Sequence, residues 1–287
     1  MKILVTGGSG QLGKAIGRHK SDHEIILCDR ETLNIENHHS VLQAVETILP
    51  DAIINCAAWT DVDGCEAAID KALNVNGYAV DTLRNVAQKI GIKLVQISTD
   101  YVFDGKKDRP YLETDAPNPL SVYGQSKLLG EKLATEEALT IRTSWIFSED
   151  ENNIVQTILK QLSSNKEFLF VNDQFGCPTY AQDIVAPILA LIESSASGIF
   201  HVTNSDPVSW YQFACEIAEL TESNSSLIVP ISSIDLIPPR AAKRPTNSIL
   251  ENAALRNSGL PPLRSHLEAL GAALQNISEA NDFLKKF

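Results

Sequence analysis

The sequence lacks an excess of basic charge and a long apolar run. Its 24 Lys and Arg residues stand against 36 Asp and Glu residues, which leaves a formal net charge of −12. That sign opposes non-specific binding to nucleic acids or to anionic membranes. The longest apolar segment, 184–192, is interrupted by Pro187 and reaches only about half the length of a membrane span. We therefore expect neither nucleic acid nor membrane as a partner.

The sequence also lacks a cysteine pattern and a leader-like start. The five cysteines are odd in number, widely spaced and contain no C-x-x-C pair, which argues against a disulfide framework and a zinc ribbon. The six histidines fall outside every motif, so we expect them at the surface and predict no metal site. Only three apolar residues follow Lys2 before Thr6, unlike a signal peptide. A cytoplasmic protein is expected.

Short β-branched runs alternate with longer helical patterns in the first half of the chain. Strands are expected at 3–5, 24–28, 52–56, 93–97 and 139–142, each apolar enough to be buried on both faces of a parallel sheet. Helices are expected at 12–20, 40–49, 65–90 and 121–137. Repeated strand–helix–strand units with right-handed crossovers predict an α/β fold with a doubly wound parallel sheet.

The second half is less regular. Helices are expected at 154–163, 181–193 and 210–220, and a strand at 167–171. Six prolines between residues 230 and 262 predict that the last third breaks into short pieces. This part of the chain is expected to form a smaller α/β lobe.

A glycine-rich segment, residues 6–13 (TGGSGQLG), follows the first strand directly and opens the first helix. Gly7, Gly10 and Gly13 allow a tight turn, a close approach of the backbone to a pyrophosphate, and close helix packing. Asp29, at the end of the second strand, can bind the adenosine ribose of NADH, whereas Arg30 can pair with the 2′-phosphate of NADPH. We predict a Rossmann NAD(P)-binding domain at 1–165 and a substrate lobe at 166–287, with the chain free to cross between them.

Tyr123 and Lys127 are spaced to lie on one face of the helix that follows the turn at 118–120. The ammonium can lower the pKa of the phenol from its usual value near 10, which would make Tyr123 a usable proton donor. The same spacing occurs in many helices whose Tyr and Lys face solvent. The glycine motif and the strand-end segment Ser98-Thr99-Asp100 favour an active site instead.

These motifs resemble the extended short-chain dehydrogenase/reductases. The segments that carry the resemblance are 6–13, 57–63, 98–105, 123–127, 142–145, 172–179 and 243–248. The resemblance implies reduction of dTDP-4-dehydro-β-L-rhamnose to dTDP-β-L-rhamnose by NADPH or NADH. By the same resemblance, Tyr123 would protonate the developing alkoxide, Lys127 would lower the pKa of Tyr123 and bond the nicotinamide ribose, and Thr99 would hold the ketone oxygen.

The resemblance implies further binding residues. Asp100 and Trp145 should contact the sugar, and Asn74 should steady Lys127. Besides the three glycines, Asp29, Arg30, Tyr123 and Lys127, the positions expected to line the cofactor are Gln11, Leu12, Asn34, Ile35, Ala58, Trp59, Thr60 and Ser98.

A cationic segment is the candidate for the diphosphate of the substrate. An acidic protein that binds a pyrophosphate needs local positive charge, and Arg240, Lys243 and Arg244 provide it in a proline-rich loop. We assign the diphosphate contact to Arg244. A solvated surface cluster is the alternative.

Three other functions fit parts of the pattern. One is a 4-epimerase or 4,6-dehydratase of the same fold, although the Asp-Glu pair that dehydratases tend to carry is absent after Thr99. The others are a 4-ketoreductase of a related dTDP-sugar and a non-catalytic regulatory subunit. Some relatives form metal-bridged dimers through glutamates, but Ala15 stands in that region here, so no metal is expected. A monomer or a homodimer fits the sequence.

Overall fold

A six-stranded parallel sheet forms the centre of the computed structural model, which describes residues 1–150 and 152–284. The strand order is β10-β5-β4-β3-β1-β2, with all neighbours parallel. The strands are β1 Lys2–Thr6, β2 Glu24–Cys28, β3 Ala52–Asn55, β4 Lys93–Thr99, β5 Leu139–Thr143 and β10 Gly198–His201. Val5 pairs with Leu27 on one side and Ile54 on the other. The apolar runs therefore form the buried strands that the sequence predicts.

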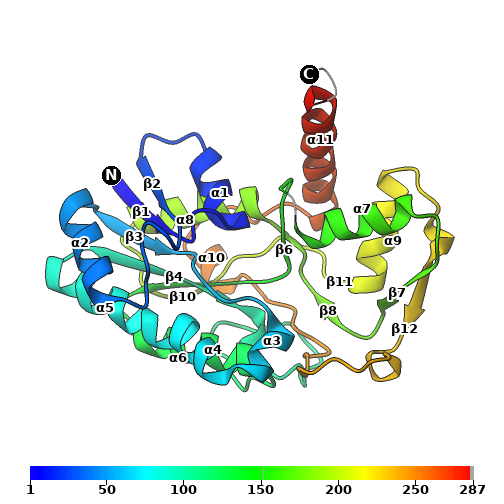
Figure 1. The fold of residues 1–287 in the computed structure, drawn as a ribbon, viewed down its shortest axis with the longest axis horizontal. Helices are drawn as coiled ribbons and strands as arrows, with labels where there is room; N and C mark the ends of the chain where they lie inside the picture. Colours follow the sequence, from blue (N-terminus) through cyan, green and yellow to red (C-terminus); the bar gives the residue numbers. More distant parts are fainter. Residues whose placement is uncertain (151, 285–287) are drawn as a thin grey trace.

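Helices cover both faces of this sheet (Figure 1). On one face lie α1 Gln11–Arg18 and α8 Ala181–Glu193, which pack their apolar residues on Ile3, Val5 and Ile54. On the other face lie α2 His38–Ile48, α5 Ala79–Ile90 and α6 Val122–Ala134, which surround Leu4 and Ile53. The doubly wound Rossmann architecture follows because each strand is apolar on both faces.

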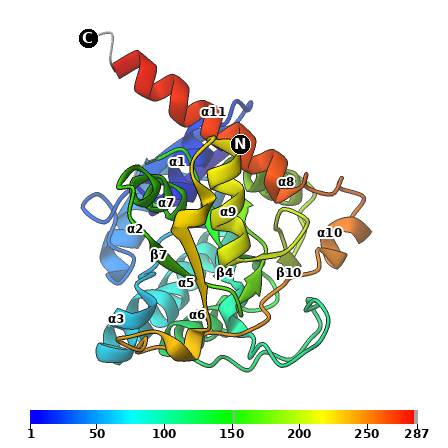
Figure 2. The same ribbon diagram turned by 90° about the vertical axis from the view of Figure 1, so that its right-hand side faces the viewer.

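A smaller lobe lies beside the carboxyl ends of the strands (Figures 1 and 2). Its helices are α7 Ile154–Ser163, α9 Trp210–Leu220 and α11 His266–Leu284, which share one apolar core. Three short strand pairs complete it: β7 Phe168–Val171 with β12 Ile228–Ile231, β8 Phe175–Gly176 with β11 Val208–Ser209, and β6 Ile146–Phe147 with β9 Thr179–Tyr180. Short helical turns lie at η2 Asp100–Val102, η3 Ser225–Leu227, η4 Ser233–Asp235 and α10 Ala253–Asn257.

The chain crosses between the two lobes more than once. It returns to the large sheet through α8 and β10, as the domain division expected from the sequence allows. One expectation about the second half is wrong. Residues 266–284 form one long helix rather than short pieces, because every proline of this region lies before residue 266. Figure 2 shows α11 extending away from the rest of the molecule.

The single helix expected at 65–90 is also wrong. The segment 62–90 folds as α3 Val62–Ala67, α4 Ile69–Leu73, a wide π turn at Asn74–Tyr78 and then α5. Asn76, in the wide turn, is buried, and its carboxamide bonds both the N–H and the C=O of Trp59. The contact between the Asn76 side chain and the Trp59 backbone thus occurs where the helix widens into the π turn.

Two of the histidines expected at the surface are buried, namely His201 and His266. Each is satisfied by a hydrogen-bond partner, since His266 pairs with Glu216 and His201 meets the carbonyl of Glu251. Within residues 1–150 and 152–284, no helix is long and apolar enough to cross a membrane, and no three His, Cys, Asp or Glu side chains gather as a metal site.

Candidate active site

A cleft runs along the carboxyl ends of the large sheet. It contains a cavity of about 570 Å³ between the two lobes and a second of about 290 Å³ at the end of β2. Gly7, Gly10 and Ala58 line both cavities, so the two form one continuous path over the glycine turn. Ligands of doubly wound sheets bind at this edge.

The glycine turn is shaped by close backbone approach. Gly7 has a φ of +65°, and a Cβ there would lie 2.7 Å from the backbone nitrogen of Ala57. A Cβ at Gly13 would collide with the carbonyl oxygen of Gly7. Gly10 begins α1 without a side-chain cap, so the first N–H groups of the helix stay available to a bound group. This geometry fits the pyrophosphate of a dinucleotide.

The smaller cavity lies at the end of β2, where the sequence predicts the adenosine of the dinucleotide. Its lining includes Asp29, Arg30, Asn34, Ile35 and Trp59. One carboxylate oxygen of Asp29 accepts hydrogen bonds from the backbone N–H and the hydroxyl of Thr32, which lower the pKa of Asp29. The side chain of Arg30 is 77% exposed and lies 3.6 Å from a Glu36 oxygen.

Helix α6 carries Tyr123 and Lys127 to the wall of the larger cavity. Its start is fixed twice, because Ser121 accepts a hydrogen bond from the N–H of Gly124 and Glu66 accepts one from that of Val122. Gly124 also lets the helix lie directly against the backbone of η2. The Tyr–Lys pair and the glycine turn therefore share one cavity.

The pKa of Tyr123 shifts in the opposite direction from the one predicted from its spacing to Lys127. Burial raises the pKa of Tyr123 above its usual value of 10, while the nearby Thr99 hydroxyl partly lowers it. Lys127 does not counter this, because its Nζ donates to the carbonyl of Ile97 at 2.6 Å and burial lowers its own pKa to about 8. Tyr123 is thus held protonated, as a proton donor requires.

Thr99 ends β4 and Asp100 begins η2, both at the cavity wall. The Thr99 hydroxyl donates to one oxygen of Asp100 at 3.0 Å. Asp100 is 1% exposed, and burial raises its pKa to about 7. Its other carboxylate oxygen has no hydrogen-bond partner in the described part of the chain. A buried polar atom of this kind calls for a ligand or water partner.

Trp145 also lines the larger cavity, and its ring stacks on that of Trp210 with a centroid separation of 3.6 Å. Its backbone has a φ of +47°, unusual for a bulky residue. Gly176 leaves room for the indole, since a Cβ there would lie 2.5 Å from the ring. The strained backbone is thus held by packing on both sides of the ring.

Arg244 does not line either cavity. Its guanidinium forms two hydrogen bonds with Asp63 of α3, at 3.0 and 2.6 Å, and so links the smaller lobe to the larger one. All other positions expected to bind the cofactor or the substrate line the cleft. They are Gly7, Gly10, Gln11, Leu12, Gly13, Asp29, Arg30, Asn34, Ile35, Ala58, Trp59, Thr60, Ser98, Thr99, Asp100, Tyr123, Lys127 and Trp145.

Sequence reasoning missed several side chains that the fold brings to the site. Asn74 is exposed, and it is Asn76 whose amide bonds Ser126 next to Lys127. Because Asn76 lies in a segment expected to be a regular helix, the sequence did not indicate this contact. Trp210 and Asp150 also line the cavity, although they belong to segments without a motif. Ser98, which the sequence did predict, also lines the cavity, but its hydroxyl donates to Glu131.

The fold and the cleft define an extended short-chain dehydrogenase/reductase. The chain belongs to the RmlD substrate binding domain family, whose model matches residues 1–279. The spore coat polysaccharide biosynthesis protein SpsK of Bacillus subtilis is 39% identical, over 98% of this chain and 99% of that protein. The dTDP-4-dehydrorhamnose reductase of Aggregatibacter actinomycetemcomitans is 37% identical, over 91% of this chain and 94% of that protein.

A solved structure gives the same result. The dTDP-4-dehydrorhamnose reductase of Bacillus anthracis, in complex with NADP, is 35% identical to this chain. The match covers 95% of this chain and 98% of that one, with a TM-score of 0.90. The family expected from the motifs is confirmed.

Proposed function

We propose that this protein reduces dTDP-4-dehydro-β-L-rhamnose to dTDP-β-L-rhamnose with NADPH or NADH. The observation that carries the proposal is the placement of Tyr123, Lys127 and Thr99 on the wall of one cavity whose floor is the glycine turn. The reductases among its relatives support the same activity.

In this proposal the residues that line the two cavities would hold the dinucleotide. The free N–H groups at the start of α1, next to Gly10, hold its pyrophosphate. Asp29, with one oxygen turned to Thr32, uses the other for the adenosine ribose, and Arg30 reaches a 2′-phosphate when one is present. When bound, the reduced nicotinamide supplies the hydride.

Three side chains carry the proton and the charge. Tyr123 gives its phenolic proton to the oxygen that becomes an alkoxide as the ketone is reduced. Thr99 turns its hydroxyl from Asp100 toward the same oxygen and stabilises the developing charge. The ammonium of Lys127 turns from the carbonyl of Ile97 toward the phenol and stabilises the tyrosinate that the transfer leaves behind.

The sugar and its diphosphate occupy the side of the cavity nearer the small lobe. Asp100, with its unpartnered carboxylate oxygen, accepts a sugar hydroxyl, and Trp145 packs against the ring. Arg244 contacts the diphosphate after exchanging part of its pairing with Asp63. We further propose that the enzyme is cytoplasmic, because reduced cofactor and nucleotide sugar are both present in that compartment. It works as a monomer or a homodimer.

A coupled assay tests this function. The purified protein is mixed with dTDP-4-dehydrorhamnose and either NADPH or NADH, and the loss of reduced-nicotinamide absorbance is followed while the product is identified as dTDP-rhamnose. A small panel of other dTDP-4-keto sugars serves as the comparison. Faster turnover of another sugar would reassign the substrate, and no consumption of cofactor with any of them would reject the reductase.

A further inference from the structure

One buried carboxylate joins the three elements that build the catalytic end of the cleft. Glu131 lies on α6 one turn beyond Lys127. Its Oε1 accepts a hydrogen bond from Ser98 of β4 at 2.5 Å and one from Nε of Arg142 of β5 at 2.8 Å. Its Oε2 accepts a second bond from Arg142 at 2.7 Å. The helix that carries Tyr123 is thus tied to the strand that carries Thr99.

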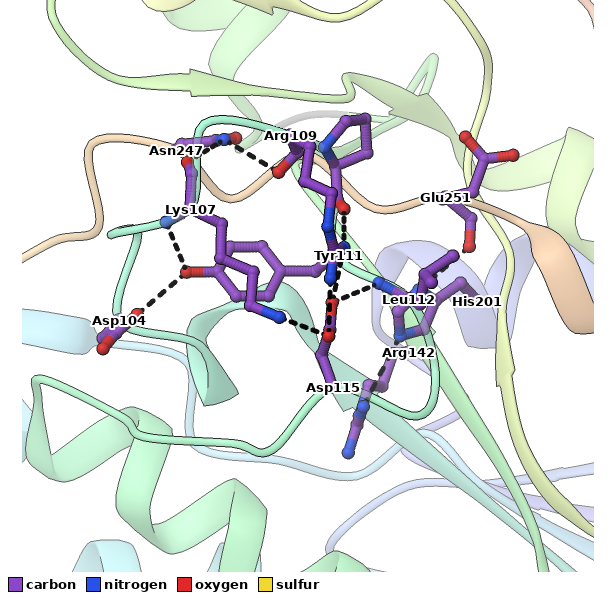
Figure 3. Close-up of polar contacts among 11 residues, drawn as sticks. Asp104, Lys107, Arg109, Tyr111, Leu112, Asp115, Arg142, His201, Asn247 and Glu251 are labelled. Atoms are coloured by element: carbon purple, nitrogen blue, oxygen red, sulfur yellow. Dashed lines mark hydrogen bonds and ion pairs between the residues drawn. The ribbon is translucent and has the colours of Figure 1, made fainter.

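The partner of this carboxylate is itself held in place. Arg142 is 1% exposed, and its guanidinium lies over the ring of Phe103, 5.1 Å from the ring centroid. Its Nη1 lies 3.5 Å from Nε2 of His201, whose Nδ1 faces the carbonyl of Glu251 at 3.1 Å. Burial lowers the pKa of His201 to about 3, so the ring is neutral, donates from Nδ1 and accepts at Nε2. Figure 3 shows Arg142, His201 and Glu251 in this arrangement.

The same network reaches the loop at 104–115 that precedes α6. Figure 3 shows Tyr111 and Asp115 of this loop beside Arg142 and His201. Tyr111 stacks on Phe103 at 4.1 Å and donates its hydroxyl to Asp104 at 2.8 Å. Arg142 therefore has little freedom to leave Glu131, and the carboxylate keeps a fixed position under the site.

Stability alone does not account for such a pair. Moving two charges out of water is costly, and replacing a buried ion pair by apolar residues of similar size is often neutral or stabilising. What an apolar pair cannot supply is a bond to Ser98, the neighbour of Thr99, or a negative charge one turn from the Lys127 ammonium.

The negative charge of Glu131 acts on Lys127, which is buried. Lys127 is 4% exposed. The titratable groups around it are Glu131 and Tyr123 on its own helix, Cys56 after β3 and Asp100 after β4. Glu131 in turn pairs with Arg142 of β5. Burial lowers the pKa of Lys127, and the charge of Glu131 acts against that effect.

We propose that Glu131 is a positioning residue of the active site: held by Arg142, it fixes the Ser98–Thr99 end of β4 against α6 and supplies the counter-charge of the Lys127 ammonium. The proposal rests on the reductase function above, since Thr99 and Lys127 act on the reacting groups only in that function.

The first test is Glu131→Gln, which keeps the shape and removes the charge. We expect kcat to fall about tenfold to a hundredfold, with the KM for NADPH nearly unchanged, because the cofactor contacts lie elsewhere. The alkaline limb of the pH–rate profile should move about one unit toward lower pH, since an opposite charge near Lys127 is lost. The matched control is Glu137→Gln, an exposed glutamate just beyond the same helix that pairs with Gln88, and it should change neither quantity. A normal kcat, or a lower kcat with an unmoved alkaline limb, would overturn the proposal.

A double variant separates positioning from stability. Glu131→Leu with Arg142→Met removes both charges, and its melting temperature should stay within a few degrees of the wild type, because the desolvation cost of both charges disappears. Its kcat should be as low as that of Glu131→Gln. Wild-type turnover, or a chain that no longer folds, would show that the pair acts only in the fold.

A direct titration distinguishes failure of this inference from failure of the reductase function. Nuclear magnetic resonance of lysines labelled with nitrogen-15 at Nζ, with the Lys127 signal assigned by its loss in Lys127→Met, reports the pKa of Lys127 without any substrate. A lower pKa in Glu131→Gln supports the counter-charge even if no dTDP-4-keto sugar is reduced. An unchanged pKa overturns it even if the wild type is an active reductase.

Discussion

The two ends of the cleft differ in how much water reaches their charged side chains. At the catalytic end Thr99, Asp100 and Lys127 are 7%, 1% and 4% exposed. At the adenosine end the side chain of Arg30 is 77% exposed. Burial shifts the pKa values of Asp100 and Lys127 toward neutrality, to about 7 and about 8. Charged side chains that are exposed to water interact more weakly with one another than buried ones do. Substitutions should therefore have large effects at the first end and small ones at the second.

The largest effect is expected at the phenol. Tyr123→Phe removes the proton donor, which typically contributes about 10²- to 10⁴-fold to the rate, and kcat should fall by that amount. Binding of NADPH, measured by fluorescence titration, should be retained because the glycine turn is untouched. An active Tyr123→Phe protein would mean that another acid, of which Asp100 is the nearest candidate, supplies the proton.

Thr99 should come next. Thr99→Val keeps the shape but removes the hydroxyl, and loss of one such donor costs about 10²- to 10³-fold in kcat. Thr99→Ser is the matched control, because it restores the hydroxyl and should turn over at close to the wild-type rate. If the valine variant were as active as the serine variant, the hydroxyl would have no part in the reaction.

The pH dependence follows from Lys127. In the proposed mechanism its charged form is the active one, and burial lowers its pKa from 10.5 to about 8. Activity is therefore full below that pH and should fall about tenfold per unit above it, while the raised pKa of Tyr123 keeps the phenol protonated. The pH–rate profile measures this limb. A separate step near pH 7 would belong to Asp100, and Asp100→Asn should remove it.

Arg244 lies between the two extremes, since its side chain is 10% exposed and that of Asp63 is 41% exposed. Arg244→Ala should raise the KM for the sugar nucleotide about tenfold, the size of one charge-assisted contact. Arg256→Ala, which removes an exposed cation of α10 that lines neither cavity, serves as the control and should leave KM unchanged. An equal KM in both variants would mean that Arg244 does not contact the diphosphate and only links its loop to α3.

The smallest effect is expected at Arg30. Arg30→Ala should raise the KM for NADPH only about threefold, because an exposed ion pair contributes about 1 kcal/mol or less. The KM for NADH should not change, since NADH carries no 2′-phosphate. A change that is equal for both cofactors would place Arg30 away from the 2′-phosphate.

The sequence located most of the cleft because its signals are local. The turn around Gly7 needs residues without Cβ atoms, and the Tyr123–Lys127 spacing places both side chains on one helical face. Both requirements are met within a few consecutive residues. Asn76 escaped prediction because its role depends on Trp59, which lies far from it in sequence. Glu131 escaped for the same reason, since nothing in its own segment points to Ser98 or Arg142.

Two properties were settled by the sequence alone, namely the alternation of strands and helices and the class of chemistry at the carboxyl ends of the strands. Apolar periodicity and residue type act over short distances, so one chain segment is enough to read them. The state of each reactive group was decided by the tertiary structure. Burial raises the pKa of Tyr123, which was expected to be lowered, and Arg244 forms its hydrogen bonds with Asp63. Solvent access and charge partners come from residues that only folding brings together.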